Sequence, residues 1–246
     1  MSEEQKNELQ KNEPNGSLSD ISGSKPGRGH EEATDMEDIE IPRAKLIQST
    51  SDEATTDNKD EKVDPGLIIN SLTKEKLPAS FIPIFKFTNY IRWNPRKKTD
   101  PNFDPAYDPG AMIFTTMDPN DPRVIKGKEF GPNNEPPAVT KYINFFTYFP
   151  GCNMPLILSF AKTSFAAGKR LNGLTQFMGG DMFSFKYKLK SVRRESDGTA
   201  FYVFDVAPDG KATQDEFTVA EKWYESFRGK NIKVHEQHQE EEQFED

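Results

Sequence analysis

One stretch in the second half of the chain alternates strictly between apolar and polar side chains, and it constrains the fold most. Residues 183–190 read FSFKYKLK, so every odd position is aromatic or aliphatic and three of the four even positions are lysines. Successive side chains of a β-strand point to opposite faces of the sheet. The pattern therefore predicts a strand with one face on an apolar core and a row of cations, Lys186, Lys188 and Lys190, on the other.

The residues around this strand predict a strand–helix–strand–strand order. Residues 154–161 form an apolar run, and residues 163–178 carry apolar side chains at helical spacing before a Gly-Gly pair. Residues 196–198 (SDG) have the composition of a hairpin turn, and residues 201–206 (FYVFDV) predict the returning strand.

The rest of the chain adds two aromatic strands, a long insertion and a C-terminal helix. Residues 80–93 and 139–149 are rich in aromatic and β-branched side chains, which favours strands. The segment between them, 94–137, holds nine of the eighteen prolines and predicts a long loop, with residues 111–116 as a short strand inside it. Residues 213–228 predict a helix that begins with a capping box. With strands near 154–161, 183–193 and 200–206, these segments predict a mostly β chain with an OB-fold-like five-stranded barrel.

Charge is distributed unevenly along the chain. The 246 residues have a net charge of −8, with 34% hydrophobic and 29% charged side chains. Residues 1–64 carry 17 acidic and 8 basic side chains, and residues 234–246 carry 6 acidic and no basic ones, which leaves 24 basic and 17 acidic side chains between them. We therefore predict a disordered acidic tail at 1–40, a partly ordered extension at 41–76, an OB-like domain at 77–229 and a second disordered acidic tail at 230–246.

Composition also limits the compartment and the chemistry. Cys152 is the single cysteine, which excludes a disulfide framework within the chain and a Cys-based zinc site. No apolar run approaches the ~20 residues of a membrane span, and the acidic N-terminus is unlike a signal peptide. We expect a soluble cytoplasmic protein without membrane contact, metal or cofactor.

Basic and aromatic side chains together predict a site for single-stranded nucleic acid. Its backbone charge attracts Lys and Arg, and its unstacked bases lie flat on aromatic rings. For any single residue, an aromatic core position or a solvated lysine is the simpler interpretation. The set is harder to explain in this way, because aromatic residues occupy both faces of the strand at 139–149. The candidate contacts are Lys86, Tyr90, Arg92, Trp93, Tyr142, Phe146, Tyr148, Lys162, Lys169, Arg170, Lys186, Lys188 and Lys190.

Catalysis is not expected from this sequence. All three histidines lie in the predicted tails, which argues against His-based nucleophilic catalysis and most zinc hydrolase schemes. There is no GxxxxGK[ST] phosphate loop. Asp181, Glu195 and Asp205 could be combined into a carboxylate metal site, which would indicate a metal-dependent nuclease. Glu195 abuts a predicted turn, however, so this is the weakest alternative.

Several segments in order, IPRAKLIQST, FIPIFKFTNYIRWNPR, LSFAKTSFAAGKRL, MFSFKYKLK and FYVFDVAPDGKAT, resemble phage-encoded single-stranded-DNA-binding proteins with an OB fold. The resemblance spans residues 41–228. It implies a non-catalytic protein of the host-cell cytoplasm that coats single-stranded DNA without strong sequence preference during phage DNA replication, recombination and repair.

The acidic C-terminal tail ends EEEQFED, with one aromatic residue among acids, as in a phage binder of this class. Such a tail can compete with DNA for a basic groove. It can also recruit phage or host replication and recombination proteins through Phe244, Glu245 and Asp246. The main alternative is a phage structural or interaction protein that binds no DNA and whose aromatic strands pack against another subunit. The sequence leaves the oligomeric state open.

Overall fold

The computed structural model describes residues 39–131, 135–196 and 198–229. All of them except Ile39 belong to one compact unit that starts at Glu40. The two predicted disordered tails, 1–40 and 230–246, lie outside the described ranges except for Ile39 and Glu40. Within those ranges, no helix is long and apolar enough to cross a membrane.

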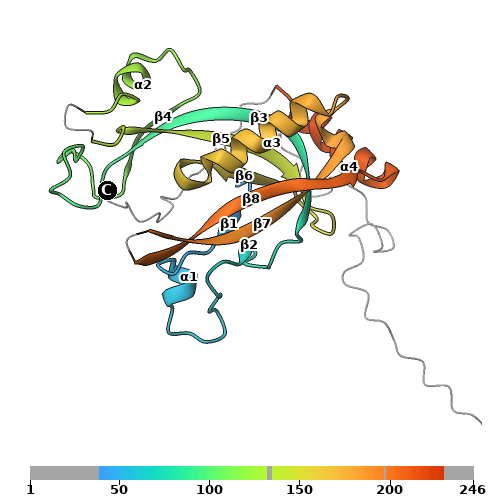
Figure 1. Cartoon of the computed structure of the whole chain (residues 1–246), viewed down its shortest axis with the longest axis horizontal. Coiled ribbons are helices and arrows are strands. Elements are labelled where there is room, and N and C mark those ends of the chain that lie inside the picture. Colours follow the sequence, from blue (N-terminus) through green and yellow to red (C-terminus); the bar gives the residue numbers. More distant parts are fainter. Residues whose placement is uncertain (1–38, 132–134, 197, 230–246) are drawn as a thin grey trace, which may run out of the picture. The chain divides into compact units, whose positions relative to one another are not determined.

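Six antiparallel strands form the main sheet (Figure 1). Neighbouring strands follow the order β6-β5-β3-β7-β8, and β4 pairs with β3. This arrangement confirms the prediction of a mostly β chain and places β3 at its centre. The strands are β3 (Ser80–Trp93), β4 (Met112–Thr116), β5 (Val139–Tyr148), β6 (Leu156–Phe160), β7 (Phe185–Ser196) and β8 (Thr199–Lys211).

β3 belongs to two parts of the sheet because it is longer than any of its partners. One edge pairs with β5 from Ile82 to Arg92. On the other edge, Ser80 and Phe81 pair with β7, whereas Tyr90–Trp93 pair with β4. The last residues of β3, together with β4 and the start of β5, thus form a three-stranded arm. Figure 1 shows this arm at the opposite end of the sheet from α4.

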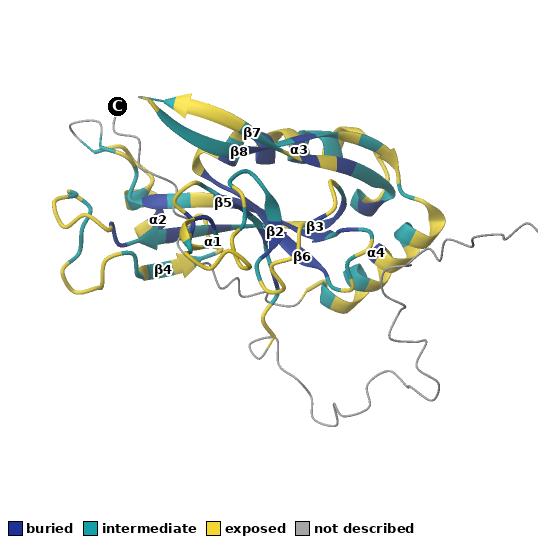
Figure 2. Cartoon of the chain, turned by 90° about the horizontal axis from the view of Figure 1, so that it is seen from below, coloured by how far each residue is buried: buried dark blue, intermediate teal, exposed yellow. Residues whose placement is uncertain are grey.

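The apolar core lies between the sheet and α3 (Phe165–Phe177). Phe160 of β6, Tyr187 of β7 and Leu171 of α3 are fully buried in it, and each such side chain stabilises the fold by roughly 1.5–3 kcal/mol. Gly168 allows α3 to approach β6 closely, because a β-carbon at this position would lie 2.6 Å from that of Phe160. Figure 2 shows the buried segments of the strands meeting in the centre of the unit.

The sheet is not a closed barrel, so the expected five-stranded barrel is wrong in this respect. Residues of the N-terminal segment lie between the outer edges of β6 and β8. The backbone N–H of Ile157 in β6 donates to the Pro42 carbonyl at 2.9 Å. The Gln48 side chain bonds the backbone carbonyl and N–H of Tyr202 in β8, at 2.8 and 2.9 Å. These contacts satisfy edge groups that a closed barrel would pair between strands.

The same N-terminal segment contains a small two-stranded ribbon. β1 (Ala44–Leu46) and β2 (Ile68–Asn70) pair antiparallel within the extension predicted at 41–76, and α1 (Asp52–Thr55) lies between them in the sequence. Glu53 of α1 holds the ribbon through ion pairs with Lys45 at 2.7 Å and Lys74 at 3.0 Å.

The insertion between β3 and β5 is more ordered than a loop. It contains β4, as predicted, and a helix that was not predicted, α2 (Pro122–Gly127). The fully buried Asn94 organises its first part. Its amide nitrogen donates to the carbonyls of Asp104, Tyr107 and Asp108 at 3.0, 2.8 and 3.1 Å, and its amide oxygen accepts the N–H of Asp104 at 2.8 Å.

The C-terminal helix α4 (Gln214–Phe227) begins with the predicted capping box of Thr213 and Glu216. Aromatic residues of α4 pack against the ring of Phe183. Phe183 lies in a 3-10 turn, Met182–Ser184, and β7 begins immediately after this turn. The strand predicted from residue 183 starts later because α4 covers its first residues.

Candidate nucleic-acid interface

The arm presents one face on which aromatic rings and cations alternate. Residues directly opposite each other in an antiparallel pair share a face of the sheet. Tyr90 lies between Thr116 of β4 and Lys141 of β5, and Arg92 lies between Phe114 and Val139. We call the surface formed by these two rows the arm face. It unites two predicted contacts, Tyr90 and Arg92, with Phe114 and Lys141, which were not predicted.

Each ring of the arm face lies beside a cation. The Lys141 ammonium lies 6.0 Å from the centroid of the Tyr90 ring, and the Arg123 guanidinium lies 4.4 Å from that of Phe114. Both arrangements are within the range of cation–π attraction. Asp121 fixes Arg123 through an ion pair of 2.7 Å, and the hydrogen bonds from Arg123 lower the pKa of the Asp121 carboxyl. The two rings are half-buried, so they are held in place while part of each remains in solvent.

Lys86 connects the arm to α3. It lies on the same side of β3 as Tyr90 and Arg92, opposite the core residue Phe145 of β5. Its exposed ammonium donates to the Asn172 side chain of α3 at 2.8 Å. A cation predicted from the sequence of β3 is thus shared between the sheet and the helix.

Other predicted stacking residues lie on the opposite face of the arm and the sheet. Phe146 is fully buried between the rings of Phe85 and Phe227, at 4.8 and 4.9 Å. Tyr142 is 4% exposed, and its hydroxyl accepts a hydrogen bond from the Trp93 indole at 3.1 Å. Burial therefore removes Tyr142 and Phe146 from the residues that can stack on a base without rearrangement.

Trp93 and Tyr148 share that opposite face but are half-buried. Burial raises the pKa of the Tyr148 hydroxyl. Neither residue lies next to Tyr90 or Arg92 on the arm face, so the structure does not bring together all the aromatic residues that the sequence suggested.

The lysine row of β7 faces away from the core, but acids balance part of it. Lys186 pairs with Glu216 of α4 at 3.0 Å, and Lys188 pairs with Asp209 of β8 at 3.1 Å. Lys190 is exposed and forms no ion pair with another described residue. The row therefore contributes less free positive charge than three unpaired lysines would.

The remaining predicted cations surround α3. Lys162 lies in the 3-10 turn Lys162–Ser164 just before the helix, and Lys169 and Arg170 lie on the helix itself; all three are exposed. Arg170 pairs with Asp205 of β8 at 2.5 Å. These residues border the core on the side where α3 meets the β7–β8 hairpin, so they lie apart from the arm face.

A comparison with family models gives a match that spans most of the chain. The model described as Pam3 phage gp34-like protein matches residues 12–233, most of the 246-residue chain. The chain belongs to the Pam3 phage gp34-like family. Membership supports the expected bacteriophage origin. Neither the curated proteins nor the solved structures compared contain a significant match.

The carboxylates considered for a metal site are dispersed in this member of the Pam3 phage gp34-like family. Asp205 pairs with Arg170, and Glu195 pairs with Arg193 at 3.5 Å. Across the described ranges, no three His, Cys, Asp or Glu side chains are grouped so that they could hold a metal ion. The predicted partner-binding residues Phe244, Glu245 and Asp246 lie outside the described residues.

Sequence reasoning missed three residues of the arm face and one aromatic residue on α3. Lys141 meets Tyr90 because β5 pairs with β3, and Phe114, with Arg123 beside it, meets Arg92 because β4 pairs with the end of β3. The clue in the sequence was the short strand at 111–116 inside the insertion. Phe177, at the end of α3, is 91% exposed, and its position off the apolar stripe of the helix could have identified it.

Proposed function

We propose that the protein binds single-stranded DNA on the arm face and coats it during phage DNA replication, recombination or repair. The observation that carries this proposal is the composition of the face. Two partly exposed rings lie beside cations, and none of the paired positions on this side of β4, β3 and β5 is acidic. Rings and cations are the two groups that single strands need from a protein.

The energetics favour binding without strong sequence preference. Stacking of a base on an aromatic ring contributes about 1–3 kcal/mol and tolerates every base. Lys86, Arg92 and Lys141 supply charge for phosphates, which are the same in every nucleotide. The arm face offers no row of amide side chains that would read base edges.

An OB-like arrangement is the finer part of the proposed fold. The order of elements supports it: an antiparallel pair, β5 and β6, is followed by a helix, α3, and then by a second antiparallel pair, β7 and β8. In this interpretation the barrel is open, and the segment around β1 occupies the place between β6 and β8.

The acidic C-terminal tail, in the same proposal, competes with DNA for the cations of the arm and recruits replication or recombination proteins. Its six acidic side chains and the absence of basic ones support this. The residues that bind those partners, in this proposal, are Phe244, Glu245 and Asp246.

Fluorescence anisotropy of a labelled single-stranded oligonucleotide, with a duplex competitor and with and without Mg²⁺, tests the proposal. Tyr90→Ala should weaken binding about tenfold, since 1.4 kcal/mol of lost stacking corresponds to a factor of ten. Lys141→Ala should lower the slope of log affinity against log salt by about 0.7, the value for one phosphate contact on a single strand. Lys59→Ala is the matched control, because Lys59 is exposed and has no ion pair among the described residues.

Three results would overturn the proposal. If the wild type assembles at about micromolar concentration, in the affinity range of weak specific complexes, and binds no single strand, the structural or interaction role is correct. If the oligonucleotide is degraded when Mg²⁺ is added, the protein is a nuclease. If Tyr90→Ala and Lys59→Ala bind equally well, the DNA lies on another surface.

A further inference from the structure

Phe177 is the most exposed large apolar residue of the described chain. It lies at the last position of α3, and 91% of it is accessible to solvent. Its helix neighbours Ala167 and Leu171 are buried in the core, so α3 does not lack an apolar face for packing. Scattered apolar residues on a surface are common, but Phe177 is accompanied by two further features that point to a ligand.

The first feature is Gly173, one turn before Phe177. A glycine inside a helix costs about 1 kcal/mol relative to alanine. At Gly168 packing explains the glycine, because a β-carbon would lie 2.6 Å from Phe160. At Gly173 a β-carbon would meet only the Phe177 ring, at 3.9 Å, which is ordinary contact. The ring thus lies back along the helix over a position without a side chain, and nothing in the core requires the glycine.

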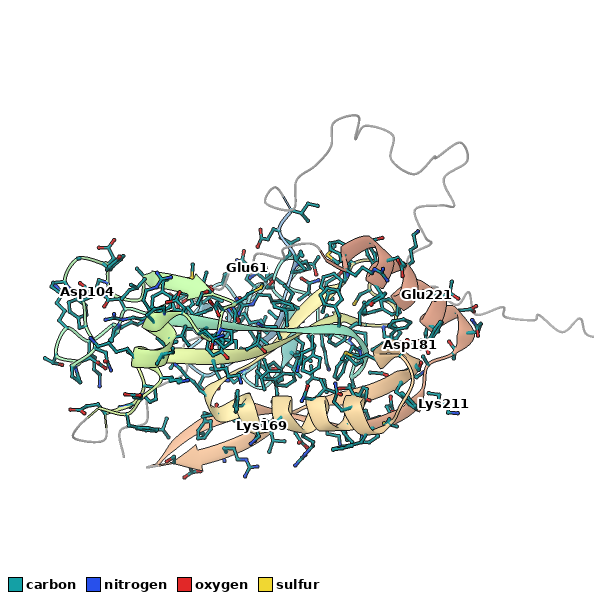
Figure 3. All side chains as sticks on the ribbon, turned by 90° about the horizontal axis from the view of Figure 1, so that it is seen from above. Glu61, Asp104, Lys169, Asp181, Lys211 and Glu221 are labelled. Carbon is teal, nitrogen blue, oxygen red and sulfur yellow. The ribbon has the colours of Figure 1, made fainter. Side chains whose placement is uncertain are left out.

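The second feature is charge. The sequence of α3, FAAGKRLNGLTQF, contains Lys169 and Arg170 and no acidic residue. Arg170 lies seven positions before Phe177, two turns along the same side of the helix. Its ion partner Asp205 is on β8, and both of these side chains remain exposed. Figure 3 shows Lys169 at the outer surface of α3. The outer surface of α3 therefore carries basic side chains and an exposed aromatic ring.

We propose that the bound single strand continues from the arm face across α3, where Phe177 stacks on a base and Lys169 and Arg170 hold neighbouring phosphates. This inference rests on the proposed function and extends its site. Lys86 provides the continuity, because it lies on the side of β3 that carries the arm face and is hydrogen-bonded to Asn172 of α3. An anionic strand with flat bases fits a basic surface with an exposed ring better than an apolar protein partner does.

The extension predicts that affinity depends on strand length. A helix of thirteen residues is about 20 Å long at 1.5 Å per residue. If the strand keeps the stacked spacing of a duplex strand, about 3.4 Å per nucleotide, crossing the helix takes about six nucleotides beyond those on the arm, and a more extended strand needs fewer. Affinity should therefore increase in two stages as the oligonucleotide is lengthened.

Anisotropy with oligonucleotides from about 6 to about 24 nucleotides, a range that brackets the site sizes of OB folds, tests this. Phe177→Ala should weaken binding of the longest strands about tenfold and leave the shortest unchanged. Phe177→Trp should keep the wild-type affinity for long strands. The emission of its added indole should be quenched by long strands and not by short ones. Tyr90→Ala should weaken binding at every length, which separates the two parts of the site.

Two results would overturn the extension while leaving the arm-face proposal intact. One is equal affinity of Phe177→Ala and wild type for strands of every length. The other is a change in oligomeric state in Phe177→Ala, measured by light scattering, with unchanged DNA affinity, which would assign the residue to a protein interface. If the wild type binds no single strand at any length, the proposed function itself fails. Far-UV circular dichroism shows whether the variants are folded.

Discussion

Glu53 offers the most quantitative test of how the N-terminal ribbon and α1 are held together. Its carboxylate accepts hydrogen bonds from Lys45 at 2.9 and 2.7 Å and from Lys74 at 3.0 Å. Burial alone would raise the pKa of this carboxyl, but the bonds from the two lysines and the backbone lower it from 4.5 to about 2. Neutralising Glu53 should therefore loosen the contact of α1 with β1 and with the turn after β2.

The magnitude follows from linkage between protonation and folding. A pKa that is lower in the folded state contributes stability that is complete above the unfolded value and is lost as the pH falls through the folded value. The difference between 4.5 and about 2 sets an upper limit of about 3 kcal/mol, at 1.36 kcal/mol per pH unit. Lys45 and Lys74 are 27% and 55% exposed, so solvent screening reduces this to about 1–2 kcal/mol.

Urea unfolding followed by tryptophan fluorescence can measure this contribution. Glu53→Gln should be less stable than the wild type by about 1–2 kcal/mol at pH 7. The difference should shrink by more than half at pH 3 and fall to roughly a tenth of its pH 7 value near pH 2, where about half of the folded wild-type carboxyl is protonated. Glu61→Gln is the control, since Glu61 is exposed and forms no ion pair within the described residues. A difference that stays constant between pH 7 and pH 2 would refute the electrostatic explanation.

Two further predictions concern the C-terminal tail and the packing of α3. Removal of residues 234–246 should raise the affinity for single-stranded DNA and reduce its dependence on divalent ions, and an unchanged or lower affinity in anisotropy would contradict competition by the tail. Gly168→Ala should destabilise the protein by about 1–3 kcal/mol in urea unfolding, because its β-carbon would lie 2.6 Å from Phe160. Gly173→Ala, in the same helix, should be neutral or stabilising by up to about 1 kcal/mol; equal effects of the two substitutions would argue against the packing of α3 on β6.

Local patterns identified the strands and the main helices well. The aromatic run at 80–93 coincides with β3, and the Thr213–Glu216 capping box marks the start of α4. These features depend on neighbours in the sequence, which is why they could be predicted. The opening of the barrel could not, since the hydrogen bonds of Gln48 to Tyr202 join residues 154 positions apart.

The candidate site depended even more on tertiary contacts. Tyr90 and Arg92 were predicted because they alternate on a strand with a polar face. Their partners Phe114 and Lys141 come from strands whose register with β3 no local pattern specifies. Likewise, no sequence rule separates Phe146, which is enclosed by two other rings, from Tyr90, which is not. The rings of Phe85 and of Phe227 in α4 cover Phe146, and this packing is a property of the assembled fold.

The lysine row of β7 shows how the assembled fold changes the interpretation of a charge pattern. Lys186 donates to the Glu216 carboxylate, which also accepts the backbone N–H of Thr213 at 2.7 Å. Partial burial alone would raise the pKa of Glu216, yet these hydrogen bonds lower it, so the carboxylate stays charged and keeps Lys186 in place. One member of the row therefore fixes the start of α4 on β7. Of the three lysines in the row, only Lys190 forms no ion pair with another described residue, which is why we place the proposed DNA contact on the arm and not on this row.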